Sequence, residues 1–228
     1  MLEVHPPHKR LRNVGEYFLH LVIITCGLLI ATQIESCVEW RAHRHIAAEA
    51  REALHKEIAG NLKTLRGAAP GLKQWKAQVN DGIAVMLRII DHPNDPAAQH
   101  GSLSVGCSGI TLDNTAWKTA ESTGALDYMP YEEASAYVNI YQAQERLLAA
   151  EGLPCADAAA TFGILSQYHL DAKAPKFSME DATAIANKLG EMKFHLGFGS
   201  AIFDENIELN AAFIEGRKPR SDFTASFR

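Results

Sequence analysis

The stretch EYFLHLVIITCGLLIATQIESCVEWRAHRH, residues 16–45, decides how this chain is built. Residues 17–34 contain no Asp, Glu, Lys or Arg, and residues 21–31 are nearly all aliphatic. About 18 helical residues at about 1.5 Å each cover roughly 27 Å, close to the roughly 30 Å hydrocarbon core of a bilayer. We therefore predict a transmembrane helix over residues 16–40, with Tyr17 and Trp40 as anchors at the membrane interfaces.

Two other interpretations of this apolar stretch are the buried helix of a soluble protein and a cleaved signal peptide. The mean hydropathy of the whole chain resembles that of a soluble protein because a polar remainder dilutes the apolar run. Gln33, Glu35 and Glu39 follow the run without the pair of small residues expected at a cleavage site. The sequence therefore favours an anchor that is retained.

Basic residues flank the predicted span on both sides. Lys9, Arg10 and Arg12 lie in the N-terminal flank, residues 1–15, whereas the bases after the span are accompanied by acids. Cytoplasmic flanks carry an excess of Lys and Arg. We therefore expect a cytoplasmic N-terminus, a single pass, and a C-terminal domain in the periplasm or outside the cell.

The cysteines fall into two groups. Cys107 and Cys155 lie in the predicted domain, where an oxidising compartment would allow a disulfide across a long loop, and two reduced, buried thiols are the alternative. Cys26 and Cys37 belong to the predicted anchor and form no CxxC pair. We interpret these two as small packing residues.

Residues 41–215 carry a helical pattern of apolar residues, which predicts an all-α bundle domain. The anchor helix is expected to continue into this domain as far as Leu65, where Gly67 and the pair Pro70 and Gly71 predict its end. Further helices are expected over residues 72–91, 113–124, 130–151, 156–169 and 178–213. Residues 97–110 predict a loop, and residues 216–228 a short basic tail.

Local signals define the ends of several of these helices. Asp113 or Thr111 is expected to cap the short helix, and Gly152 with Pro154 is expected to end the helix that starts at Pro130. Ser178 and Asp181 predict a capping box for the last helix, which contains three glycines.

One face of the predicted span is polar at its ends and small in its middle. His20, Gly27, Ala31 and Glu35 recur at helical spacing, and the small pair would let another helix approach closely. We predict a helix–helix interface in the membrane on this face, with membrane protein subunits or a second copy as partners besides lipid. The alternative is that His20 and Glu35 reach towards the headgroups and Gly27 is incidental.

The sequence carries no recognisable catalytic or cofactor motif. It has no HExxH, GxSxG, Walker or dinucleotide-binding pattern, so we expect neither an enzyme nor a bound cofactor. His43 and His45 diverge on a helix, which argues against a metal site. A net charge of −5 supplies no basic field for nucleic acid.

Four segments of the chain resemble small, uncharacterised one-pass bacterial membrane proteins. They are HPPH at 5–8, GLLIA at 27–31, ESCVEWRAHRH at 35–45 and AWKTAESTGALDYMPYEEASAYVNIYQ at 116–142. The resemblance implies a single-pass protein in the inner membrane of a bacterium, so that the C-terminal domain would be periplasmic. It implies no catalytic residue.

The sequence favours a membrane-anchored accessory or scaffold protein that takes part in assembling a membrane protein complex, without catalytic activity. The alternative is an extracytoplasmic helical sensor or small-ligand-binding domain, because a helical bundle can enclose a cleft. The alternative predicts a pocket. The roughly dozen residues before the span are too few for a signalling domain.

Overall fold

The computed structural model describes residues 14–99, 101, 103–168 and 176–220. Residues 1–13 of the predicted flank and 221–228 of the predicted tail lie outside this range. The chain divides into two compact units, residues 1–49 and 50–228, which we call the anchor unit and the bundle unit.

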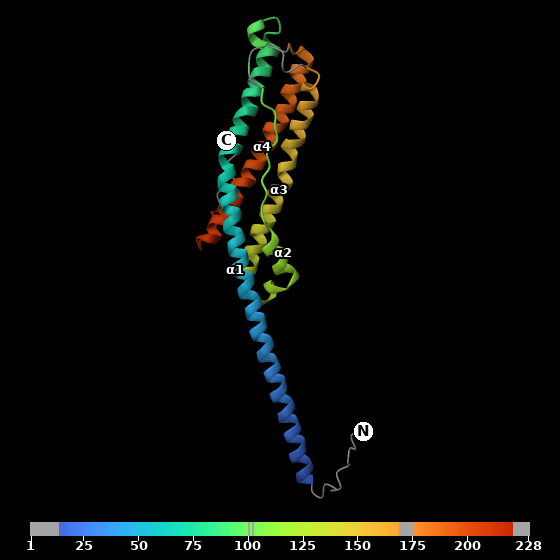
Figure 1. Ribbon diagram of the computed structural model, residues 1–228, viewed down its shortest axis with the longest axis vertical. Coiled ribbons are helices and arrows are strands. Elements are labelled where there is room, and N and C mark those ends of the chain that lie inside the picture. Colours follow the sequence, from blue (N-terminus) through green and yellow to red (C-terminus); the bar gives the residue numbers. More distant parts are fainter. Residues whose placement is uncertain (1–13, 100, 102, 169–175, 221–228) are drawn as a thin grey trace. The chain divides into compact units, whose positions relative to one another are not determined.

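The described residues form α-helices joined by irregular segments and two 3₁₀ turns (Figure 1). The α-helices are α1 (Val14–Asp91), α2 (Thr115–Ser122), α3 (Tyr131–Leu165) and α4 (Met179–Ile214), and the turns are η1 (Pro96–Gln99) and η2 (Ala125–Tyr128). No β-strand occurs in the part of the chain that the structure describes. The all-α class expected from the sequence is confirmed.

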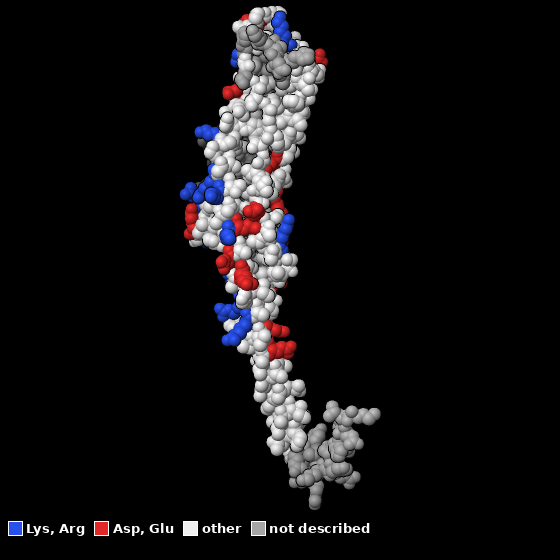
Figure 2. All heavy atoms as spheres, viewed as in Figure 1, with Lys and Arg blue, Asp and Glu red and all other residues white. Residues whose placement is uncertain are grey.

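The anchor unit contains the apolar part of α1. Large side chains are exposed on every side of this helix, including Phe18, Leu28 and Ile30. Figure 2 shows neither blue nor red atoms along residues 17–34, in keeping with their lack of charged residues. By length and composition, α1 and α3 are both apolar enough to cross a membrane, but the apolar window of α3 is partly buried in the bundle unit. The long apolar N-terminal helix is therefore present.

In the bundle unit, residues 50–91 of α1 pack with α3 and α4 (Figure 1). Helices α1 and α3 run parallel, because Arg51 pairs with Glu133 and Asn61 pairs with Gln144 further along both helices. Helix α4 runs antiparallel to α3. Buried aliphatic side chains from all three helices fill the interior, and each stabilises the fold by about 1.5–3 kcal/mol relative to exposure. They include Val79, Met86 and Ile89 of α1, Ala158 and Leu165 of α3, and Ile185, Leu189 and Met192 of α4.

Four buried amides, which we call the amide ladder, cross this apolar interior. Asn61 Nδ2 donates to Gln144 Oε1 at 3.2 Å, and Gln144 Nε2 donates to Asn210 Oδ1 at 3.1 Å. Asn210 Nδ2 in turn donates to the backbone oxygen of Asn206 at 2.7 Å. Because a buried amide without a partner is costly, the ladder favours one register of α1, α3 and α4.

Residues 103–114, which we call the return segment, run alongside the bundle in an extended path (Figure 1). Parallel α1 and α3 require such a segment, because the chain must travel back along the bundle before α3 begins. Near its start Leu103 packs on Gly82, where an added Cβ would lie 2.9 Å from Leu103 Cδ1. At its end the backbone of Asp113 exchanges two hydrogen bonds with the side chain of Asn61, of 2.8 and 2.9 Å.

The cap of α2 differs from the prediction. Asn114 occupies the N-cap position without a side-chain hydrogen bond, so the expectation that Asp113 or Thr111 caps this helix was wrong. Glu57 of α1 supplies the acceptor instead, taking hydrogen bonds from the backbone N–H groups of Ala116 and Trp117 at 2.7 and 3.2 Å. A carboxylate also complements the positive end of the helix dipole.

Two predicted helix ends are absent. Helix α1 continues through Gly67, Pro70 and Gly71, and α3 continues through Pro154, so the predicted divisions at these points were wrong. An internal proline removes one backbone hydrogen bond at a cost of about 3 kcal/mol, which the packing of the flanking turns offsets. The start of α4 was predicted correctly, since Ser178 Oγ accepts from the backbone N–H of Asp181 at 3.0 Å.

Candidate functional site

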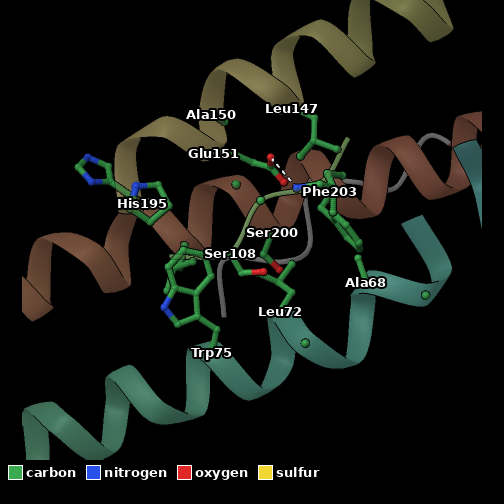
Figure 3. Close-up of a pocket in the computed structure, with 17 residues that line it drawn as sticks. Ala68, Leu72, Trp75, Ser108, Leu147, Ala150, Glu151, His195, Ser200 and Phe203 are labelled. Carbon is green, nitrogen blue, oxygen red and sulfur yellow. Dashed lines mark hydrogen bonds between the residues drawn. The ribbon is translucent and has the colours of Figure 1, made fainter. Parts of the chain in front are cut away.

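A cavity of about 180 Å³ opens between the three long helices of the bundle unit (Figure 3). Helix α1 contributes Gly67 to Trp75, the return segment contributes Ser108 to Ile110, α3 contributes Leu147 to Pro154, and α4 contributes His195 to Phe203. Most of the lining is apolar. An engineered cavity of about 150 Å³ in another protein holds benzene, so this space suits a ligand of about one aromatic ring.

Residues without side-chain bulk create this space. A Cβ added at Gly67, Gly71 or Gly199 would meet no atom within 4 Å, although all three residues line the cavity. On α3 the lining includes Pro154, whose ring leaves the carbonyl of Ala150 without its usual intrahelical donor. Gly67, Gly71 and Pro154, which suggested helix ends in the sequence, instead line a hollow between continuous helices, as does Gly199, which was expected inside the last helix.

The return segment is held across one side of the cavity by a covalent bond and a hydrogen bond. Cys107 and Cys155 form a disulfide with a Cα–Cα distance of 4.9 Å. Three residues further on, the backbone N–H of Ile110 donates to Glu151 Oε2 at 3.1 Å (Figure 3). Both links join the return segment to α3, so this wall of the cavity is fixed in place.

Glu151 is the carboxylate in the lining. Burial raises the pKa of Glu151, and the hydrogen bond from the backbone of Ile110 opposes this rise without cancelling it. Its second oxygen, Oε1, accepts no hydrogen bond from any described residue, and it is not among the atoms that the protein encloses. One oxygen of a partly desolvated carboxylate is thus left for another donor.

Four other side chains of the lining carry polar atoms: Trp75, Ser108, His195 and Ser200. His195 Nδ1 is 2.6 Å from Asp157 Oδ2, and since an ionised carboxylate only accepts, Nδ1 carries the hydrogen. Lys76, which lies outside the lining, donates from Nζ to Ser200 Oγ at 3.2 Å. Trp75 Nε1 has no partner among the described residues, but protein atoms cover it.

The residues predicted to form a membrane interface lie on α1 in the anchor unit. His20, Gly27, Ala31 and Glu35 are all exposed, and a Cβ added at Gly27 would meet nothing within 4 Å. No described residue packs on Gly27, so the structure leaves the interface a prediction. Of the two predicted anchors, Tyr17 is exposed and Trp40 stacks under Arg44, whose guanidinium carbon lies 4.7 Å from the ring centroid.

The sequence did not indicate the cavity. In the sequence, Glu151 is one acid among others in a helical segment, so nothing distinguishes it. The other residues that line the cavity are far apart in the chain. The available signal was the coincidence of glycine or proline in three segments that otherwise read as helices, at Gly67 to Gly71, Gly152 to Pro154 and Gly197 to Gly199.

Within the described residues, no group of three or more His, Cys, Asp or Glu side chains is arranged to hold a metal ion. No protein-family model, curated protein or solved structure matches this chain. The geometry of the cavity and the character of α1 therefore carry the functional argument.

Proposed function

We propose that this chain is a single-pass membrane protein whose helical domain binds a small molecule in the cavity between α1, α3 and α4. The observation that carries the proposal is the set of cavity-lining glycines, at which an added side chain would meet open space. Gly67 and Gly71 are exposed and Gly199 is half-buried, so the space opens to solvent at the surface of the bundle unit. Its mostly apolar walls come from three helices and the return segment, and an open space with such walls is typical of a ligand site.

Membrane attachment rests on the anchor unit. Leu19, Ile23 and Ile30 are among the large apolar side chains that α1 exposes, and exposing them to water would forfeit the free energy of their burial. Lipid is the medium that removes this cost. High-speed centrifugation of the full chain without detergent tests attachment: we expect the chain in the membrane pellet, and recovery in the supernatant would contradict it.

The disulfide supports a domain on the oxidising side of the membrane. Disulfides persist in the periplasm and outside cells and are rare in the cytosol. The bond between Cys107 and Cys155 therefore favours the orientation predicted from the basic N-terminal flank, with the bundle unit outside the cytoplasm. Protease digestion of sealed vesicles of known sidedness tests this, since the bundle unit should be cut only where the periplasmic side is accessible.

Purification from native membranes tests the binding function. The protein is extracted in mild detergent and denatured, and small molecules released from it are identified by mass spectrometry. We expect one compound in near-equal amount to the protein, and its loss when Gly71→Leu fills the cavity. The proposal is contradicted if the native chain and the Gly71→Leu variant release the same compounds in the same amounts.

A second function, the accessory or scaffold role, is favoured by one separate observation. The small face of α1 at Gly27 is open, with room for a second helix against the backbone. In the purification above, this role predicts stoichiometric membrane subunits that co-purify with the chain. Binding rather than turnover is common to both proposals.

A further inference from the structure

We propose that the occupant of the cavity is a small cationic amine with an apolar body of about one ring, and that Glu151 receives its ammonium group. This inference rests on the proposed binding function and names the chemical class of the ligand. It is carried by the arrangement of hydrogen-bond acceptors in the lining, rather than by the size of the cavity alone.

Glu151 is the group that would bind the ammonium. One of its oxygens is satisfied by the backbone N–H of Ile110, and the other accepts nothing from the described residues. The carboxyl is also partly desolvated, so its ionised form has lost part of its water shell without gaining a cation from the described residues. An ammonium group would supply the missing donor and the missing charge in one contact.

The other polar groups of the lining also bear on the charge of the ligand. Pro154 leaves the Ala150 carbonyl as an additional acceptor on the same helix as Glu151. Among the described residues that line the cavity, none is Lys or Arg. Glu151 is therefore the acidic group of a lining whose hydroxyls, those of Ser108 and Ser200, can accept as well as donate, which suits a ligand that brings donors.

Three nearby groups could favour an anion instead. Lys76 lies behind Ser200 and is already hydrogen bonded to that hydroxyl, and His195 is paired with Asp157. The N–H of Trp75 is covered by protein atoms. An anion in the cavity would also face the carboxylate of Glu151, so these groups do not outweigh it.

The remaining walls of the cavity indicate that the ligand also has an apolar group. Leu72, Trp75, Leu147, Leu196 and Phe203 surround the space with aliphatic and aromatic surface. An aromatic or branched aliphatic group of about benzene size fills it without displacing these side chains. Trp75 and Phe203 also provide ring faces, which attract an ammonium group.

Three probes of similar shape and different charge test the inference. They are 2-phenylethylamine, 2-phenylethanol and phenylacetate, titrated by calorimetry at neutral pH into the full chain in detergent micelles. We expect the amine to bind at least about tenfold more tightly than the alcohol, since a hydrogen bond to a charged group is worth more than a neutral one. The anion should bind most weakly.

Two variants separate the ligand class from the cavity. Glu151→Gln keeps an acceptor for the backbone of Ile110 but removes the charge, so it should abolish the preference for the amine and preserve binding of the alcohol. Gly71→Leu fills the cavity, and Gly199→Leu is a second variant of the same kind. Both should abolish binding of the amine and of the alcohol, so that any heat that remains measures partition of the probe into micelles. Helical circular dichroism confirms that each variant is folded.

The outcomes distinguish the inference from the proposed function. Equal binding of the three probes, tighter binding of the anion, or an amine preference that survives Glu151→Gln overturns the amine assignment while cavity binding stands. If no probe binds the native chain more tightly than the filled variants, the amine assignment fails and the proposed function loses its support as well.

Discussion

Glu151 makes the stability of the bundle unit depend on pH. Its folded pKa is raised by burial above the unfolded value, so the folded state holds the proton more tightly. The contribution of Glu151 to stability is therefore fully present below the unfolded pKa and is lost as pH rises through the folded pKa. Glu151→Gln should flatten this fall, with a higher melting temperature than the native chain at neutral pH and a shrinking difference towards pH 4.

Thermal melts followed by circular dichroism between about pH 4 and pH 7 measure this effect. Glu145→Gln on the exposed side of α3 is the matched control, and it should leave the pH profile unchanged. A Glu151→Gln profile parallel to that of the native chain would show that the buried carboxyl is not the source of the pH dependence.

Gln144 holds the centre of the amide ladder, with Asn61 on one side and Asn210 on the other. Gln144→Leu would leave the Oδ1 atom of Asn210 buried without its donor, at a cost of about 1–3 kcal/mol. Urea unfolding should show a lower midpoint with an unchanged slope. Gln142→Leu is the same substitution at an exposed position of α3, and an equal loss there would argue against the ladder.

At the scale of helices and loops, the helical period of the apolar residues predicted more of the structure than the glycines and prolines did. The apolar stripes correctly predicted helical structure within residues 50–65, 72–91, 131–151, 156–165 and 179–213, because packing of those stripes forms the core. Glycine and proline were misread as ends because their local cost is a few kcal/mol, which tertiary packing of long helices exceeds. The cavity could not be predicted, since it depends on which helices lie side by side and in which register.

The disulfide is the main covalent constraint on the return segment. Cys107 and Cys155 are separated by 48 residues, and closing a loop of that length in the unfolded chain is worth about 4 kcal/mol in the chain-entropy account. Replacing both with Ser should lower the urea midpoint of the bundle unit accordingly. Replacing the exposed thiols Cys26 and Cys37 with Ser should not, and similar losses in the two double variants would contradict a specific role for the bond.

At the scale of the whole molecule, the two units pose separate questions. The bundle unit has a buried apolar core and a cavity of its own, whereas the apolar residues of α1 in the anchor unit are exposed throughout residues 17–34. The proposed ligand binding therefore belongs to one unit and the proposed membrane attachment to the other. Variants in either unit can be interpreted without assuming how the two are placed relative to each other.

The anchor unit predicts an assembly in detergent or lipid. If a second helix packs against the face of α1 that carries Gly27 and Ala31, then Gly27→Ile should separate the helices and reduce the oligomeric mass measured by light scattering in detergent. Thr25→Ile places the same isoleucine side chain about 200° around the helix from Gly27, and it should leave the mass unchanged. If the oligomeric mass is the same for both variants as for the native chain, either the helices meet on another face of α1 or only lipid surrounds α1.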